Sequence, residues 1–260
     1  MCYTLVMGIK IIIFICFVYF TAGIVDAICG GGGLFTVPAL MSIGLPAHMV
    51  VGTNQCSLIL GNVMSIYKYN KSGNIHWRIA AIAVPFTLVG AIIGSKLNLI
   101  VSERYLQILM LALLPVIAIF TFVKKDIGTE DHFDEVSPAR QFWGTAIISL
   151  TVSAYHAFYG PGSGLFFMAL YCIVLKFDVL KGNGLTKIIL FIASMMSGIT
   201  YAVSGNVQWT IVSAASVFYI GGNYLGATIA ITKGAKVVKP AFIVMIIVLF
   251  AKLAFDFFAK

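Results

Sequence analysis

The chain has few charged residues, and this scarcity is its first informative property. Only 10% of its 260 residues are charged, whereas 60% are hydrophobic. Soluble domains usually carry about 25% charged residues, and a water-soluble fold must keep its whole outer surface wettable. The composition therefore excludes an ordinary soluble domain and indicates a protein whose solvent is the lipid bilayer.

Sequence patterns of enzymes and metal sites are missing as well. The chain has no G-x-S-x-G, H-E-x-x-H or P-loop pattern, and its four histidines are scattered. Its five cysteines include no C-x-x-C pair, so buried free thiols are expected. The glycine run 30–33 is no dinucleotide fingerprint, because no strand or βαβ unit surrounds it. We therefore expect no enzymatic activity, no metal and no other cofactor; a membrane scaffold or a redox enzyme is the weakest alternative.

Positive charge is present, but it is split into small clusters. The net charge is +8, which in a soluble protein would suggest a nucleic-acid partner. Here the cations lie between apolar runs, where the positive-inside rule places them on the cytoplasmic face of a membrane. The clusters are Lys68, Lys71 and Arg78; Lys124 and Lys125; and Lys233, Lys236 and Lys239. The charge therefore indicates membrane topology, with lipid and not nucleic acid as the partner.

Apolar runs fill most of the chain. A helix that crosses the bilayer needs about 20 apolar residues. The runs fall at 5–28, 33–44, 48–69, 77–98, 104–123, 141–158, 162–175, 185–203, 208–231 and 238–258. The runs 33–44 and 162–175 are too short to cross about 30 Å of hydrocarbon at about 1.5 Å per residue. The sequence predicts an all-α polytopic membrane protein with eight long spans and two short broken helices. The first span is expected to be retained and not cleaved as a signal peptide.

Two parts of the chain repeat one another. Ser-Gly-Asn-Ile-His-Trp at 72–77 recurs as Ser-Gly-Asn-Val-Gln-Trp at 204–209, 132 positions later. Two G-x-x-x-G pairs match at the same offset and are interpreted as surfaces for close helix packing: Gly90 with Gly94, and Gly222 with Gly226. The predicted organisation is a first transmembrane repeat at 1–123, a cytoplasmic, solvated linker at 124–139 and a second transmembrane repeat at 140–260.

The matching loops of the two repeats differ in charge. Loop 68–78 has three cations, whereas its counterpart 198–208 has no charge. Conversely, 233–239 has three cations, whereas its counterpart 96–104 has a net charge of only +1. A loop of one repeat is therefore cytoplasmic where the matching loop of the other repeat is not. This predicts an inverted-topology repeat with five helical segments in each half.

Each short run follows a glycine-rich stretch that would break a helix, at 30–33 and at 160–164. Broken helices at membrane depth are tolerated where the freed backbone lines a cavity. The helix that follows presents unpaired N–H groups and a positive dipole end. Two such ends, one from each repeat, predict an anion site near the midplane; the alternative is that the glycines only allow close packing. The candidate residues are Gly31, Gly32, Gly33, Gly162, Ser163 and Gly164.

Few ionisable residues lie within the apolar runs, and each is therefore a candidate functional residue. Asp26 and His156 precede the two breaks, 130 positions apart. Either side chain can exchange a proton near neutral pH in a suitable environment, so both are candidates for proton coupling. Alternatively, Asp26 caps the following helix and His156 bonds a backbone carbonyl. Lys187 could bind an anionic substrate or extend to the membrane interface.

Polar side chains on two further segments complete the candidate substrate site. Thr53-Asn54 aligns with Thr186-Lys187 at an offset of 133, and Gln55 follows directly. Some of these side chains are expected to line the pathway and others to bond between helices.

The motifs in both repeats resemble those of a known family. The segments are D-A-I-C-G-G-G-G-L-F-T-V-P-A-L at 26–40, G-T-N at 52–54, Y-G-P-G-S-G-L-F at 159–166 and L-T-K at 185–187. They are similar to the TauE/SafE family of sulfite and organosulfonate exporters, and the resemblance covers roughly residues 10–258. It implies a carrier of the bacterial-type inner (plasma) membrane for sulfite, sulfoacetate or a related organosulfonate, coupled to protons. Leu185 departs from the pattern, because a small residue is more usual there.

Together these observations predict a secondary transporter whose anion binds between the two broken-helix ends. Thr53, Asn54, Thr186 and Lys187 complete the pocket, and the two halves rock to expose it alternately. The alternative is a passive small-anion channel, in which the same helix ends form a selectivity site. A homodimer is compatible with either.

Overall fold

The structure is a computed structural model that describes residues 8–102, 104, 105, 128 and 130–234. The predicted run 238–258 lies outside these residues, as does all but the first two residues of the run 104–123. The same holds for Lys124, Lys125, Lys236 and Lys239. In the described part the chain is helical and contains no strand.

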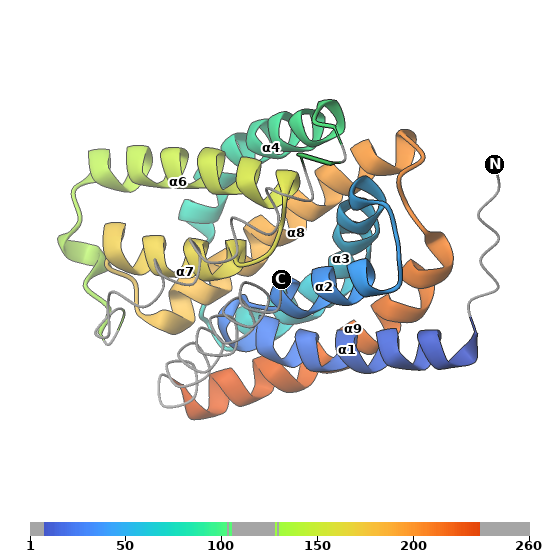
Figure 1. The fold of residues 1–260 in the computed structure, drawn as a ribbon. Coiled ribbons are helices and arrows are strands. Elements are labelled where there is room, and N and C mark those ends of the chain that lie inside the picture. Colours follow the sequence, from blue (N-terminus) through green and yellow to red (C-terminus); the bar gives the residue numbers. More distant parts are fainter. Residues whose placement is uncertain (1–7, 103, 106–127, 129, 235–260) are drawn as a thin grey trace, which may run out of the picture.

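Eight α-helices and one 3-10 helix make up the described part of the chain (Figure 1). They are α1 (Ile9–Cys29), α2 (Gly33–Ser42), α3 (Ala47–Lys71), α4 (Trp77–Ile100), η1 (Phe133–Glu135), α6 (Pro138–Phe158), α7 (Ser163–Val174), α8 (Val179–Val203) and α9 (Trp209–Lys233). Among the described residues, α1, α3, α4, α8 and α9 are long and apolar enough to cross a membrane. Helix α2 has 10 residues and α7 has 12, so both are too short to span, as predicted. The total of eight long spans stays a prediction.

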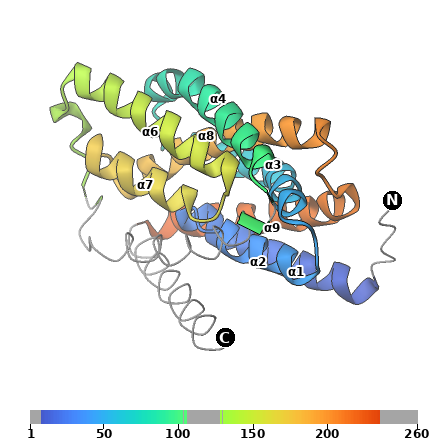
Figure 2. The same ribbon diagram turned by 45° about the horizontal axis from the view of Figure 1, so that its top comes forward.

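The helices form two bundles, and each bundle combines helices from both predicted repeats (Figures 1 and 2). The first bundle consists of α1, α2, α3 and α9, with α1 packed along α9. The second consists of α4, α6, α7 and α8, with α4 packed along α6. Helices α3 and α8 pack against each other where the bundles meet. Each predicted repeat therefore contributes one long helix, α4 or α9, to the bundle that holds the other described helices of the opposite repeat.

Matched glycines on α4 and α9 allow these close contacts. A side chain at Gly90 or Gly94 would collide with backbone atoms of α6. The contacts are Gly90 with Leu150, Gly94 with Ala154, Gly222 with Phe20 and Gly226 with Ile24. Because only a residue without a side chain lets two helix backbones approach this closely, the four glycines are packing positions, as predicted.

The repeated Ser-Gly-Asn motif forms the same turn twice, once between α3 and α4 and once between α8 and α9. Gly73 and Gly205 both have a φ of 73°, a left-handed conformation that glycine adopts without strain. A tyrosine at the end of the preceding helix donates a hydrogen bond to a carbonyl beside a break. The bonds are Tyr69 to the oxygen of Ala27, 2.9 Å, and Tyr201 to the oxygen of Ala157, 2.8 Å.

The described part of the linker packs against the second bundle. Its helix η1 places Phe133, 9% exposed, in a stack with Phe177 of the α7–α8 loop, with ring centroids 4.6 Å apart. Glu135 pairs with Lys176 of the same loop, Oε2 to Nζ 2.7 Å. Within residues 130–137 most side chains are exposed, as expected of a solvated linker, whereas Phe133 and Val136 are buried and attach the linker to the second bundle.

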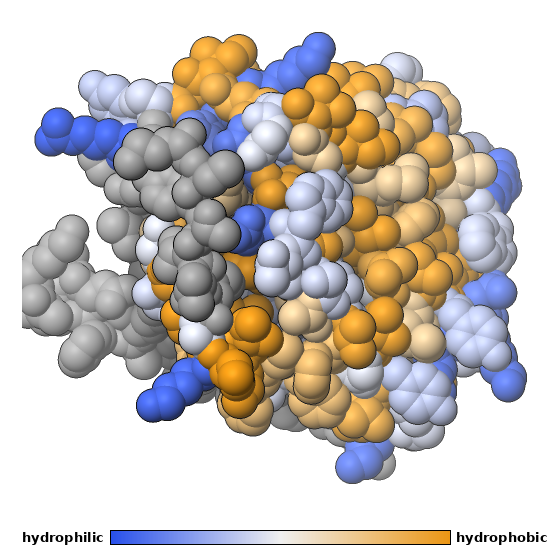
Figure 3. Space-filling model, turned by 90° about the vertical axis from the view of Figure 1, so that its right-hand side faces the viewer, coloured by the Kyte–Doolittle hydropathy of each residue, from blue (hydrophilic) through white to orange (hydrophobic). Residues whose placement is uncertain are grey.

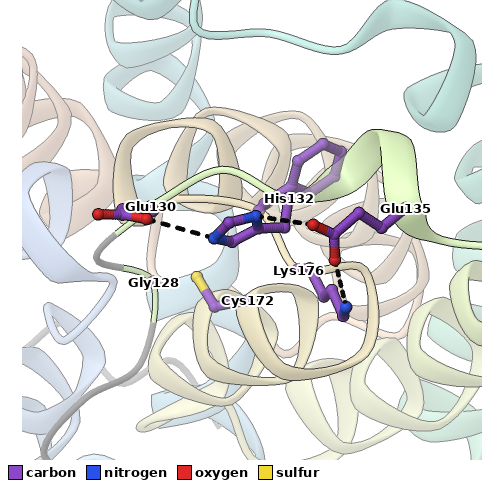
Figure 4. Close-up of a pocket in the computed structure, with 7 residues that line it drawn as sticks. Gly128, Glu130, His132, Glu135, Cys172 and Lys176 are labelled. Carbon is purple, nitrogen blue, oxygen red and sulfur yellow. Dashed lines mark hydrogen bonds and ion pairs between the residues drawn. The ribbon is translucent and has the colours of Figure 1, made fainter.

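A hollow of about 400 Å³ lies beside this docked linker (Figure 4). His132 lies between two acidic side chains, 3.3 Å from Glu130 and 3.1 Å from Glu135. The lining residues are Gly128, Glu130, His132, Glu135, Cys172, Lys176 and Phe177. None of the residues predicted to bind substrate or protons is among them.

The outer surface of the bundles is largely apolar. Figure 3 shows a face on which hydrophobic side chains predominate, with hydrophilic side chains mainly near its margins. Large apolar side chains such as Ile147 on α6 and Val217 on α9 are 60% and 65% exposed. A surface of this kind is stable when lipid chains and not water surround it, which agrees with the composition.

Candidate functional site

The two glycine-rich breaks lie in direct contact. The backbones of Gly30, which ends α1, and Gly164, in the first turn of α7, approach so closely that a side chain on either would collide with the other. A side chain at Gly33 would in turn lie 3.1 Å from the Cα of Pro161. The prediction that one break from each repeat meets the other is therefore matched by the geometry, whereas an anion-binding role remains a proposal.

Asp26 and Lys187 form a buried ion pair beside the first break. Asp26 lies in the last turn of α1 and is 4% exposed, whereas Lys187 lies on α8 and is 0% exposed. The distance from Nζ of Lys187 to Oδ2 of Asp26 is 2.7 Å, and the same Nζ donates to the backbone oxygen of Asp26. The alternative in which Lys187 extends to the interface is therefore wrong, because its ammonium group points into the protein.

Two further groups surround the Asp26 carboxylate. The backbone N–H of Gly32, at the start of α2, donates to Oδ1 of Asp26 at 3.3 Å. The hydroxyl of Tyr219, on α9, lies beside the Asp26 side chain and makes no hydrogen bond of normal geometry within the described part of the chain. We call Asp26, Gly32, Lys187 and Tyr219 the Asp26 centre.

His156 occupies the matching position beside the second break. Its Nδ1 lies 2.6 Å from the hydroxyl of Ser163, and its Nε2 lies 2.9 Å from the hydroxyl of Ser194. The amide of Gln55, on α3, donates to the backbone oxygen of His156 at 2.5 Å. We call His156, Ser163, Ser194 and Gln55 the His156 centre. All four side chains are buried.

The protons of the His156 centre have more than one arrangement. The Ser163 hydroxyl can donate to the oxygen of Gly160 at 2.7 Å, and the Ser194 hydroxyl can donate to Oε1 of Gln55 at 3.0 Å. A hydroxyl has one proton to donate. If both serines donate in this way, both imidazole nitrogens must donate, and His156 carries a positive charge. If one serine turns its proton toward His156, the imidazole is neutral. The charge on His156 is therefore linked to the direction of these hydrogen bonds.

The two centres correspond position by position. Asp26 bonds Gly32 and His156 bonds Ser163, so each titratable side chain contacts the start of the short helix that follows it. Lys187 and Gln55 come from the opposite repeat, and each donates to the backbone oxygen of the titratable residue. A shared backbone framework thus holds two different sets of side chains.

This correspondence corrects the alignment of α3 with α8 by one residue. Gly52 lies against the backbone oxygen of Asn206, and Gly184 lies against that of Asn74, an offset of 132 for both pairs. Lys187 is therefore the counterpart of Gln55 and not of Asn54. Since one residue turns a helix by about 100°, the offset of 133 used in the sequence comparison paired side chains that point in different directions.

The remaining candidate ligands make bonds within the protein. Thr53 accepts a hydrogen bond from the backbone N–H of Gln208 at 2.9 Å, at the start of α9. Thr186 donates to the oxygen of Gly182 at 2.8 Å, within α8. Asn54 accepts a bond from Tyr19 at 3.2 Å. The backbone oxygen of Gly31 accepts from Leu34 at 3.1 Å, and Gly162 is the residue before α7.

Three residues near the site were missed by the sequence analysis. Asn183 donates to the backbone oxygens of Ala27 and Ile28, both at 2.9 Å, and so holds the end of α1. It precedes Lys187 by one helical turn, and this spacing of four residues was a usable signal. Tyr219 and Ser194 lie in apolar or mixed runs. In such runs no sequence pattern shows whether a buried hydroxyl faces a titratable side chain or only contacts a neighbouring helix.

Comparison with known proteins assigns the family. The family model described as "Sulfite exporter TauE/SafE" matches residues 15–253. The chain belongs to the TauE/SafE family. No solved structure matches this TauE/SafE chain.

The curated relatives of this TauE/SafE protein carry transporter names. A "Probable membrane transporter protein ORF9" of Sinorhizobium sp is 29% identical over 237 residues, covering 91% of this chain and 90% of the relative. A "Probable membrane transporter protein" of Haemophilus influenzae is 27% identical over 254 residues, covering 96% of each chain. A "Probable membrane transporter protein YfcA" of Escherichia coli K12 is 24% identical over 243 residues, covering 92% of this chain and 88% of the relative. With its apolar helices, the chain is therefore a multi-pass plasma-membrane transporter.

Proposed function

We propose that this TauE/SafE protein is a secondary transporter that exports a small sulfur-containing anion, such as sulfite, sulfoacetate or a related organosulfonate, by proton-coupled alternating access. The observation that carries the proposal is the buried ammonium group of Lys187, held beside the contact between the two broken helices. Ionisable side chains are costly inside a membrane and mark the paths of ions and substrates. The sulfur chemistry of the anion rests on the family.

The anion is proposed to bind where the breaks meet. The N-termini of α2 and α7 supply backbone N–H groups and positive dipole ends, from Gly31, Gly32 and Gly33 on one side and Gly162, Ser163 and Gly164 on the other. Lys187 supplies the full positive charge. Thr53, Asn54 and Thr186 hold the neighbouring helices in position through the bonds described above and complete the wall of the site.

Asp26 and His156 are the proposed proton-coupling residues. Both are buried, both adjoin a break, and both have hydrogen-bond partners that change when a proton is gained or lost. Their protonation therefore changes the charge at the place where the anion binds. This linkage between proton and anion is what a proton-coupled carrier requires.

The contact between Gly30 and Gly164 supports a cycle in which the bundles move apart and together. In the described state no side chain fits between these two backbones. An anion can therefore enter only after the first bundle, which carries Gly30, separates from the second, which carries Gly164. Access from one side at a time follows if the separation opens toward one face and then the other.

Counterflow in proteoliposomes tests the proposal. Vesicles that contain the full chain and unlabelled sulfite or sulfoacetate should accumulate the labelled anion, because a carrier exchanges its substrate across the membrane. Vesicles with the Lys187→Met variant should accumulate no more labelled anion than vesicles without protein. Lys181→Met is the matched control, since Lys181 lies on the same helix but pairs with Asp131 at the surface. Normal counterflow by Lys187→Met would contradict the site, and transport without counterflow by the wild type would favour the passive channel.

A further inference from the structure

We propose that the Asp26 carboxylate occupies the place of the transported anion in the described state, so that one anion and one proton bind together and cross the membrane in the same direction. The inference rests on the proposed function and adds to it the sign and the stoichiometry of coupling. It also assigns the chemistry of the group that is recognised, a pyramidal oxyanion with three oxygens.

The surroundings of the Asp26 carboxylate are those of a bound anion. One oxygen accepts from the ammonium group of Lys187 at 2.7 Å, and the other accepts from the N–H of Gly32 at 3.3 Å. A cation and a helix N-terminus are both donors that proteins commonly use to bind oxyanions. Here both donors are directed at a side chain of the protein itself, so a substrate anion can use them only if that side chain releases them.

A third donor is unused. The Tyr219 hydroxyl is fully buried and makes no hydrogen bond of normal geometry among the residues described. A side chain at Gly32 would start 3.2 Å from this hydroxyl and 2.7 Å from Cβ of Asp26, so the absence of a side chain leaves the hydroxyl facing the same space. Unpartnered buried hydroxyls are costly and call for an explanation. A carboxylate oxygen can accept more than one bond, but the two oxygens of Asp26 are directed at Lys187 and Gly32 and leave the Tyr219 hydroxyl without a well-formed bond. A sulfite or sulfonate group has a third oxygen that can point to this hydroxyl.

The charges in the centre decide the sign of coupling. Lys187 and ionised Asp26 together are neutral, and an added anion would leave two negative groups sharing one buried cation. Like charges at such a distance disfavour each other strongly in a buried site. When Asp26 is protonated, it no longer neutralises the ammonium group of Lys187. The incoming anion then restores the neutrality of the centre. The anion therefore binds best to the protonated form, and by reciprocity the bound anion favours proton uptake.

The neutrality of the centre also determines which species are transported together. A monovalent sulfonate together with one proton carries no net charge, so its movement is insensitive to the membrane potential. The algebraic sum of the anion gradient and the pH difference then sets the direction of transport, so export requires an outward anion gradient larger than any inward proton gradient, and each exported anion carries one acid equivalent with it. An exchanger that moves protons against anions would instead need the two to compete for the site.

Methanesulfonate is a suitable probe, because it stays ionised throughout the working pH range. In proteoliposomes with the full chain, a methanesulfonate gradient should move one proton per anion in the same direction, and an imposed potassium diffusion potential should leave the rate unchanged. The Asp26→Asn variant should move no protons with methanesulfonate, and its methanesulfonate binding should lose its dependence on pH. At alkaline pH its affinity should exceed that of the wild type by roughly 5- to 150-fold. Protons that move opposite to the anion, or proton transport by Asp26→Asn, would overturn the proposal.

Binding measurements keep the test independent of transport and of folding. Methanesulfonate should raise the Tm of Asp26→Asn far more than that of the wild type at alkaline pH, because the variant leaves Lys187 without its internal anion. The double variant Asp26→Asn/Lys187→Gln has no such cation and should show no shift. Equal shifts for Asp26→Asn and the wild type would refute the competition between carboxylate and anion. Absence of wild-type counterflow would instead contradict the proposed function.

Tyr219→Phe tests the third donor alone, because it removes only the hydroxyl. Compared in the Asp26→Asn background, it should weaken methanesulfonate binding several-fold and acetate binding much less, since an acetate held by Lys187 and Gly32 as Asp26 is has no oxygen directed at Tyr219. If both anions bind as before, the assignment of a three-oxygen group is wrong.

Discussion

At the first break the titratable side chain is an acid paired with a cation, whereas at the second it is an imidazole between two hydroxyls. The backbone around them is the same: a long helix ends, a short helix begins, and a residue of the opposite repeat donates to the carbonyl of the titratable residue. The difference shows that similar backbone frameworks can hold an ion pair at one break and an imidazole between hydroxyls at the other. We infer that the Asp26 centre binds the proton that travels with the anion, whereas protonation of His156 controls the second break without adding a transported proton.

The largest expected effect is at the Asp26 centre. Lys187→Met leaves the carboxylate of Asp26 buried without its cation, and breaking a buried pair in this way costs about 3–5 kcal/mol. Thermal unfolding in detergent micelles should show the loss. The double variant Asp26→Asn/Lys187→Met should recover most of it, because no unpaired charge remains. Equal instability of the single and double variants would show that the ion pair is not what holds this region.

The contact between the breaks should be the next most sensitive feature. In Gly164→Ala the added methyl group meets the backbone of Gly30, and overpacking of this kind costs about 1–3 kcal/mol. Transport should fall with stability, because the two bundles can no longer close. Gly221→Ala on α9 is the control: its methyl group would lie 3.5 Å from the ring of Phe20, an ordinary contact. A wild-type rate in Gly164→Ala would mean that the bundles need not touch there.

A smaller effect is expected at the His156 centre. His156→Gln keeps a polar side chain but cannot bond both Ser163 and Ser194 as the imidazole does, and losing one bond costs about 0.5–1.5 kcal/mol. Methanesulfonate transport should slow while one proton still accompanies each anion, as measured with a pH-sensitive dye inside the vesicles. Loss of proton movement in this variant would erase the functional difference between the two centres.

The smallest effect is expected for the exposed ion pair of Glu135 and Lys176, which lies outside both centres. It serves as the reference for the buried pair of Asp26 and Lys187. The hydrogen bond from Lys176 lowers the pKa of Glu135 below its ordinary value of 4.5. A carboxyl group with a lowered pKa stabilises the fold above its unfolded-state pKa, and this contribution is lost as the pH falls through the folded-state value. Glu135→Gln should therefore lower the Tm slightly at neutral pH and not at all in strong acid. Asp134→Asn, which removes a neighbouring surface charge, is the control; a difference that persists in acid would contradict the ion-pair origin.

The sequence predicted the helical class and the two breaks, and it singled out Asp26, His156 and Lys187 as the candidate residues beside them. It could not show that Asp26 and Lys187 bond each other, because 161 positions separate them and the pairing depends on how α1 and α8 are rotated. The alignment of Asn54 with Lys187 at an offset of 133 was wrong for a related reason, because it depends on how α3 and α8 are rotated. Docking of the linker was missed because acidic residues dominate its composition, although Phe133 and Val136 hold it in place.

The exchange of α4 and α9 between the bundles has a mechanical consequence. Within the described residues, the chain passes from one bundle to the other only at the turns after α3 and α8, which contain Gly73 and Gly205. Any tilt of one bundle against the other must twist these two turns, while the remaining described connections move with their own bundle. Nothing lies within 4 Å of either glycine where a side chain would project. The most recognisable repeated motif of the sequence therefore lies at both described crossings between the bundles, and the bundles do not coincide with the predicted repeats.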